Sequence, residues 1–240
     1  VLPSLRLSYD NLPHSSLKKC FAYCSILPRD SFISKDEMVR IWMALGFLLP
    51  PKGSNKLMED IGSEYFNILL WNCLLQDGER NYEGDIYSYK MHDLVHDLAL
   101  DLSKHHSVTV KADHELNDIS KAIYVRVDEG ISNIKPPILR RNFEKVQVLY
   151  AESRIVRDLV PYPRHLIGLV LKHSYEGELP NSLSNLKYLK YLDISRCYNM
   201  NKLPDYITRL YNLQTLSVQS ATQLPTNICN LINLRHILDY

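Results

Sequence analysis

Two histidines spaced four residues apart are the first residues of the sequence that could carry chemistry. In the run His92-Asp93-Leu94-Val95-His96, an α-helix would place both imidazoles on one face, with an acid beside the first. This is close to the His-Glu-x-x-His pattern of zinc hydrolases, in which the glutamate is the general base. Here the acid is the shorter aspartate, and no third ligand follows at usable spacing, because His105 and His106 fall at the expected helix end. We therefore predict no metal site.

His92 alone could have a different role. A histidine just ahead of a helix N-terminus, where backbone N–H groups lack helical partners, can donate a hydrogen bond to a phosphate held by another domain. The same ring could instead cap the helix within a packed turn. The residues themselves leave these two roles open.

Catalytic and phosphate-cradling motifs are absent from the sequence. None of the eight glycines opens a G-x-x-x-x-G-K-[ST] loop, and no G-x-S-x-G nucleophile motif occurs. Cys20 and Cys24 share the apolar face of one expected helix, which favours buried core thiols. We predict that this segment is not an enzyme and holds no catalytic residues.

Helical periodicity dominates the first hundred residues, which must position His92. Apolar residues at three- and four-residue spacing predict helices, and Ser34 with Glu37 forms a capping box ahead of the second helix, which Gly46 could end. Asp93 is the expected N-cap of the last helix. The expected elements are helices at 14–27, 34–46 and 57–72, a β-hairpin of 73–77 with 86–91, and a helix at 94–102.

Three helices, a hairpin and a trailing helix match the winged-helix layout, expected over residues 1–104. Winged helices commonly bind DNA through basic residues on a recognition helix. The helix at 57–72 carries Glu59, Asp60 and Glu64 and no basic residue after Lys56. DNA binding is therefore only a third functional alternative, and nucleic acid is not an expected partner.

The second half of the sequence repeats every 20 to 24 residues, as leucine-rich repeats do. Each repeat should form a short strand on a concave face, a Leu-Pro turn and a return segment. The fold class is thus mixed α/β with two domains, in which residues 105–140 are a linker or solenoid start. Residues 141–240 hold about four to five repeats, open at the C-terminal end, and Ile123-x-Val125-x-Val127 could be an initial strand. The repeat cores begin at Val146, Leu166, Leu189, Leu213 and Leu234, and the Leu-Pro pairs begin at Leu179, Leu203 and Leu224.

Composition and charge narrow the function classes further. The net charge of +1 gives no general attraction to nucleic acid. The longest apolar stretch, 41–49, contains Gly46 and runs into two prolines, so it falls short of the ~20 residues that span a membrane. Five cysteines, an odd number, and no Asn-x-Ser/Thr site favour a reducing intracellular setting. The sequence starts without Met, and we expect it to be a piece of a longer protein.

Four motifs in this order resemble the plant nucleotide-binding leucine-rich-repeat disease-resistance proteins of the coiled-coil type. They are LRLSYDNLPHSSLKKCFAYCSILPRD at 5–30, IWMALGFL at 41–48, MHDLVHDLA at 91–99 and the Leu-Pro repeats after about residue 140. The resemblance covers nearly the whole chain, as a fragment with the winged helix and the first repeats.

The resemblance implies an ADP/ATP-dependent switch that triggers plant defence. It makes His92 the contact to the β-phosphate of bound ADP, with Asp93 stabilising the off state and Met91 packing beneath. The phosphate-binding loop would lie upstream, so this segment would hold no complete cofactor site. Implied partners are the protein's own nucleotide-binding domain and a pathogen effector or guarded host protein, bound on the concave surface. The implied location is cytoplasmic, with the nucleus as an alternative. A truncated interaction scaffold without a nucleotide switch remains the alternative function.

Overall fold

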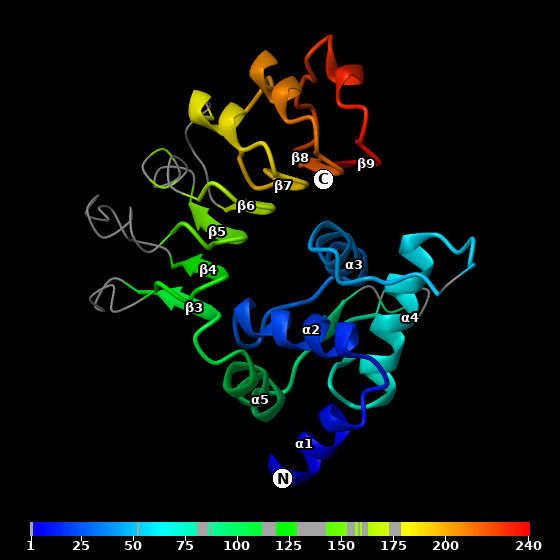
Figure 1. Cartoon of the computed structure of the whole chain (residues 1–240). Helices are drawn as coiled ribbons and strands as arrows, with labels where there is room; N and C mark the ends of the chain where they lie inside the picture. Colours follow the sequence, from blue (N-terminus) through cyan, green and yellow to red (C-terminus); the bar gives the residue numbers. More distant parts are fainter. Residues whose placement is uncertain are drawn as a thin grey trace. The chain divides into compact units, whose positions relative to one another are not determined.

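The chain divides into two compact units, Val1–Ser107 and Val108–Tyr240. The computed structural model describes residues 2–51, 53–80, 86, 88–111, 119–128, 143–152, 157, 159, 163–172 and 179–240. Figure 1 labels its α-helices and the strands from β3 onward. Each unit is described by itself below. The winged-helix range expected from the sequence, 1–104, ends close to this division.

The first unit is the winged helix. The hairpin of β1 and β2 is antiparallel, with Gln76 opposite Lys90. The expected three helices, hairpin and trailing helix are confirmed, whereas the first helix was not predicted, because its nine residues are too few to show a clear helical period. The elements are α1 (Leu2–Asp10), α2 (Ser15–Tyr23), a 3₁₀ turn η1 (Cys24–Ile26), α3 (Lys35–Ala44), α4 (Met58–Trp71), β1 (Gln76–Asp77), β2 (Tyr89–Lys90) and α5 (Asp93–Ser103).

Local signals set both ends of α3. The hydroxyl of Ser34 accepts a hydrogen bond from the Glu37 backbone N–H at 3.3 Å, as the capping box predicts. At the other end Gly46 has φ +70°, and its N–H donates to the Met43 carbonyl at 3.0 Å. The next N–H, of Phe47, donates to the Trp42 carbonyl, which completes a Schellman motif. The helix stops where glycine can adopt the left-handed conformation without a Cβ clash.

The core of the first unit is aromatic. Trp42 and Phe66 are fully buried, with ring centroids 6.1 Å apart, and Phe66 meets Tyr89 edge to face at 4.7 Å. Helices α3 and α4 pack closely at Gly62, where an added Cβ would lie 2.4 Å from Val39 Cγ1. These contacts join α3, α4 and β2 around one site and place the residues that follow β2.

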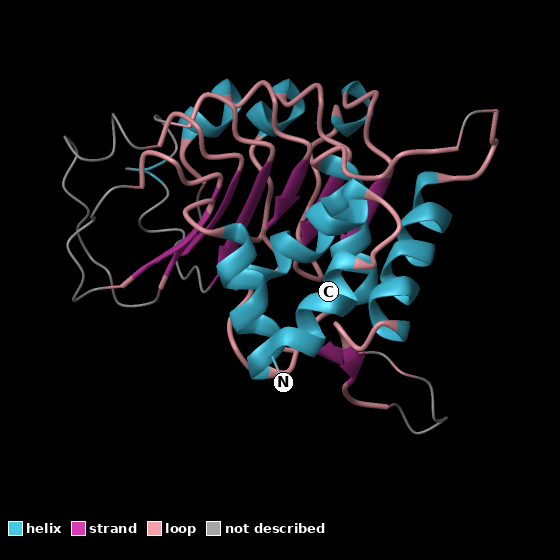
Figure 2. Cartoon of the chain, turned by 60° about the horizontal axis from the view of Figure 1, so that its bottom comes forward, coloured by secondary structure: helices cyan, strands magenta, loops and turns pink. Residues whose placement is uncertain are grey.

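The second unit is a leucine-rich-repeat solenoid. Its strands form one sheet in chain order, and from β4 onward neighbouring strands are parallel. Figure 2 shows these strands in one layer, with the 3₁₀ helices along the other side of the repeats. The elements are β3 (Ser107–Val110), β4 (Tyr124–Val127), β5 (Val148–Glu152), β6 (Gly168–Lys172), η2 (Asn181–Asn185), β7 (Tyr191–Asp193), η3 (Asp205–Arg209), β8 (Thr215–Val218), η4 (Ile228–Asn230) and β9 (His236–Asp239).

The predicted repeat residues form the core of this unit. Leu169, Leu192 and Leu216 are fully buried, one per strand, and the apolar positions after each Leu-Pro pair pack beneath them. The weak prediction of a strand at Ile123-x-Val125-x-Val127 is confirmed by β4. In the last repeat the packing is looser, since Leu234 is only half-buried and Ile237 is 45% exposed.

Candidate functional site

The candidate site lies where the chain leaves β2 and enters α5. His92 is the N-cap of α5, with extended backbone angles (φ −63°, ψ 144°), and its Nδ1 accepts a hydrogen bond from the Leu94 N–H at 3.2 Å. The prediction that Asp93 caps this helix is therefore wrong. Asp93 is already the first helical residue, and the imidazole reaches the N–H two residues on, as a capping side chain must.

This cap determines which nitrogen of His92 carries the proton. A ring nitrogen that accepts a hydrogen bond is unprotonated, so in the neutral imidazole the proton is assigned to Nε2. The His92 side chain is exposed, and Nε2 contacts no partner among the described residues. The ring thus presents an N–H donor outward beside a helix N-terminus, where the helix dipole favours anions. The capping and phosphate-donor roles are compatible, since each uses a different nitrogen.

Asp93 points to a cation from a distant part of the chain. Its carboxylate lies 3.7 Å from Arg29 Nη1, and the same guanidinium donates through Nη2 to Asp97, one turn further along α5. The hydrogen bond to Asp97 is the largest cause of the raised pKa of Arg29. Arg29 follows the 3₁₀ turn η1, so this triad ties the Pro28–Arg29 segment to the first two turns of α5. All three side chains are about half exposed.

His96 fixes the same segment from inside. It is buried, and its Nε2 donates to the Leu27 carbonyl at 2.8 Å, while its Nδ1 is buried without a hydrogen-bond partner in the described structure. Because Nε2 carries the proton of this bond, it is not available as a metal ligand, and the only free lone pair of the ring is on the buried Nδ1. The described residues contain no group of three potential ligands that could hold a metal ion.

The structure brings together most of the residues that the sequence singled out here. Met91 is buried at 7% exposure directly before His92, and Asp93 follows it. Sequence reasoning missed Arg29 as the partner of Asp93. A signal existed, because two carboxylates four residues apart on one helix face repel each other and a nearby cation would offset this, but the sequence could not say which one.

The helix α4 carries none of the basic side chains that a DNA-recognition helix uses. Its residues, Met58–Trp71, include no lysine or arginine, and Lys56, just before it, pairs with Glu64 at 2.5 Å. Recognition helices need free cations that can reach phosphates or base edges.

Comparisons with known proteins agree with the resemblance seen in the sequence. Residues 26–99 match the model of the disease resistance protein winged helix domain. The chain is 35% identical to disease resistance protein RGA1 of Solanum bulbocastanum over 196 residues, which are 81% of this chain and 17% of that protein. The chain belongs to the plant disease resistance proteins.

Two further members of the family illustrate how much of the chain the likeness covers. A disease resistance RPP13-like protein 1 of Arabidopsis thaliana is 33% identical over 90% of this chain and 21% of its own length. The ToMV resistance protein Tm-2(2) of Solanum lycopersicum is 28% identical over 97% of this chain and 28% of its own length. The chain thus spans less than a third of these relatives. Their names describe resistance to disease and no enzymatic reaction.

No helix in the described ranges is long and apolar enough to cross a bilayer.

Proposed function

We propose that this chain is the nucleotide-sensing and partner-recognising portion of a plant immune receptor that triggers a defence response. In this proposal His92 contacts the β-phosphate of ADP held by an adjoining nucleotide-binding domain, and the repeats recognise a pathogen effector or a guarded host protein. The observation that supports it is the outward Nε2–H of His92, left available because Leu94 occupies Nδ1. The proposed location is cytoplasmic, with the nucleus as an alternative.

The residues present fit one contact to a phosphate. Bound ADP would supply an anionic oxygen that accepts a hydrogen bond, and His92 would supply the donor at the positive end of the α5 dipole. Asp93 is also anionic and lies close by, but Arg29 offsets its charge. Its role is to position the start of α5 through Arg29, so that the closed state is more populated while ADP is bound.

The test uses the full-length protein that contains this chain. His92→Ala removes both the cap and the donor, whereas His92→Asn restores a good N-cap and removes the imidazole. We expect both variants to retain less ADP after purification, measured by chromatography of the released nucleotide. Only His92→Ala should also lose stability, by about 0.5–2 kcal/mol. His106→Ala, at another exposed histidine, is the matched control and should retain ADP.

In plant leaves, the same His92 variants and Asp93→Val should give cell death without any effector. Normal protein levels with full ADP retention and no cell death would refute the switch and leave the scaffold function. Arg29→Ala tests the positioning role of Asp93. It should lower ADP retention in the same direction as Asp93→Val, and the double variant should add little, because both changes break one interaction.

A further inference from the structure

The exposed edge of the repeats, at the N-terminal ends of the strands, is built from a stack of tight turns. In each turn a backbone N–H donates to the carbonyl three residues earlier, and two residues lie between. In the described part of the second unit the donors and acceptors are Ala122 to Ile119 at 2.9 Å, Val146 to Phe143 at 3.2 Å, Leu166 to Pro163 at 3.4 Å, Leu189 to Leu186 at 3.0 Å, Leu213 to Leu210 at 2.9 Å and Leu234 to Leu231 at 2.9 Å.

Main-chain bonds fix the order and spacing of these turns. In the first five turns the residue after the donor offers its carbonyl to two N–H groups of the next repeat, as Ile167 does to Lys190 and Tyr191. The same bond pair recurs from Ile123 through to Gln214. Six turns at the ~4.8 Å strand spacing form an edge about 24 Å long, which about seven residues of extended peptide would cover.

The central residues of these turns divide the edge into two halves; we call this surface the turn edge. They are exposed, except for half-buried Ser120. The first four turns supply four cations against one carboxylate, and these cations form no ion pair with the described residues. The central pairs are Ser120-Lys121, Glu144-Lys145, Arg164-His165, Lys187-Tyr188, Tyr211-Asn212 and Ile232-Asn233.

The last three turns of the turn edge carry large apolar side chains, and the fourth turn, Lys187-Tyr188, belongs to both halves. Tyr188 is 55% exposed, Tyr211 is 61% exposed and Ile232 is 84% exposed, in three consecutive turns. The ring of Tyr188 also lies 5.4 Å from that of His165 in the preceding turn, so the two halves are continuous. Exposed aromatic side chains in a row are typical of surfaces that bind protein.

Asparagine side chains hold the apolar turns in place. Asn212 Nδ2 donates to the Lys187 carbonyl and Asn233 Nδ2 donates to the Tyr211 carbonyl, both at 2.7 Å. A surface fixed in this way loses little conformational freedom on binding, which lowers the entropic cost of association.

We propose that the turn edge binds an extended segment of a partner protein in which a run of Asp and Glu residues adjoins a short run of aromatic or aliphatic residues. The four cations pair with the acidic run, and Tyr188, Tyr211 and Ile232 pack against the apolar run. A nucleic acid or an anionic membrane would need cations along the whole edge, and here the last two turns lack them. The proposal rests on the partner-recognition part of the proposed function and names a surface distinct from the strand face.

The probe for this proposal is a fluorescein-labelled peptide of four acidic residues, a glycine and Leu-Trp-Leu, together with its reversed sequence. Binding to the 240-residue chain is measured by fluorescence anisotropy. The variant Lys145→Glu with Lys187→Glu should weaken binding of the better peptide by roughly tenfold, and Tyr211→Ser with Ile232→Ser by a similar factor. Added salt should weaken peptide binding by the parent chain. It should have a much smaller effect on peptide binding by the lysine variant, which has already lost these charge contacts.

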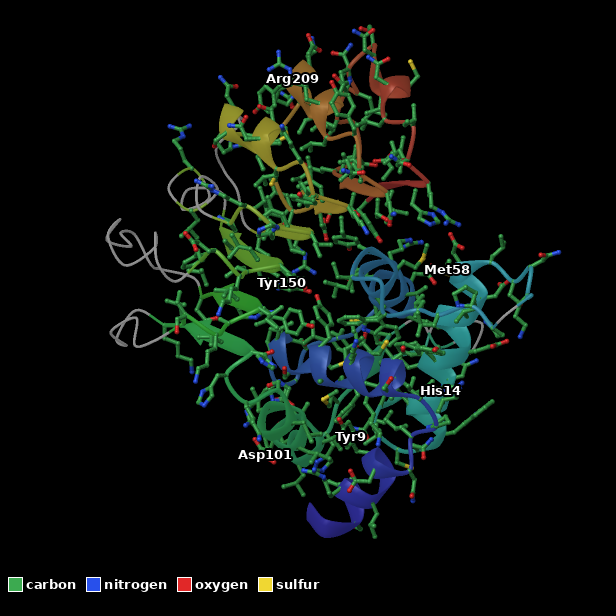
Figure 3. The ribbon with its side chains drawn as sticks, in the orientation of Figure 1. Tyr9, His14, Met58, Asp101, Tyr150 and Arg209 are labelled. Atoms are coloured by element: carbon green, nitrogen blue, oxygen red, sulfur yellow. The ribbon has the colours of Figure 1, made fainter. Side chains whose placement is uncertain are left out.

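The matched control is Arg196→Glu with Arg209→Glu, which changes the net charge equally. Both arginines are exposed and lie outside the turn edge. Figure 3 shows Arg209 on the side of the 3₁₀ helices, away from the strand that carries Tyr150. This control should change binding by less than about twofold, since it leaves the contacts in place. Thermal unfolding followed by circular dichroism checks that each variant folds, and the tyrosine variant carries the test if the lysine variant does not.

Several results would overturn the proposal: equal weakening by the control, equal binding of a peptide without its apolar residues, or stronger binding of duplex DNA or anionic vesicles. Failure of both peptides to bind would do so as well. Since no nucleotide takes part, such a failure leaves the ADP test of the proposed function unaffected.

Discussion

The two units solve the problem of core packing in different ways. In the winged helix, large side chains such as Trp42 and Phe66 occupy positions that have no equivalent elsewhere in the unit. They join helices that are far apart in sequence. In the solenoid, leucines recur at the same position, so that Leu169, Leu192 and Leu216 each pack mainly against the adjacent repeats. The winged helix should therefore respond to a core change as a whole, and the solenoid should respond locally.

The sharpest test of this difference is truncation of Phe66. It contacts both Trp42 and Tyr89, so Phe66→Ala should cost the first unit about 3–5 kcal/mol of unfolding free energy. Urea unfolding followed by tryptophan fluorescence reports on this unit alone, because both tryptophans, Trp42 and Trp71, lie in it. A loss below 1 kcal/mol would mean that this core is not cooperative.

Truncation along the solenoid should give a graded effect. Leu192→Ala removes a fully buried side chain with a repeat on either side, and we expect a loss of about 2–4 kcal/mol. Leu234→Ala, at a half-buried position in the last repeat, should cost about 1 kcal/mol. Urea unfolding followed by far-UV circular dichroism measures both, with unchanged tryptophan fluorescence as the control. Equal losses at the two sites would contradict nearest-neighbour stability.

A smaller effect is expected where α3 and α4 pack most closely. In Gly62→Ala, the new Cβ would lie 2.4 Å from Val39 Cγ1, a stiff β-branched side chain. Overpacking should outweigh the better helix propensity of alanine and leave a net loss of about 1–2 kcal/mol. The double variant Gly62→Ala with Val39→Ala should recover part of the clash cost. A stabilised single variant would show that the two helices can separate without penalty.

Alkaline pH should weaken the first unit, by about 1–2 kcal/mol at pH 10 from Cys24 alone. Burial raises the pKa of the Cys24 thiol from 9.0 to about 12, and burial also raises that of Cys20. Above pH 9 the unfolded thiol ionises while the folded one stays protonated, so stability that is complete below pH 9 falls as the pH approaches 12. The fluorescence-detected unfolding of Cys24→Ala should depend less on pH between 8 and 10.5. An identical pH slope in that variant would exclude a contribution from Cys24.

Much of the fold could be predicted because its signals are local in sequence. The capping residue Ser34, the helix-stopping Gly46 and the recurring leucines of the repeats each act through neighbours within a few residues or within one repeat. The order of helices and hairpin in the winged helix followed from the same periodicities. The boundary at the start of α5 was misplaced by one residue, because histidine is a less common N-cap than aspartate.

The candidate site was predicted only in part, for a physical reason. The Met91-His92-Asp93 motif is contiguous, so the sequence alone identified it as a unit and placed it at a helix start. The proton on His92 Nε2 follows from a local bond to Leu94, which the sequence pattern does not reveal. The pairing of Asp93 with Arg29 and the bond from His96 to Leu27 depend on groups that meet only when η1 packs against α5. Short-range spacing in the sequence determined the elements and the repeat. Tertiary packing decided the contacts between residues more than sixty positions apart, because the periodicity of apolar residues reports only on neighbours within one element or repeat.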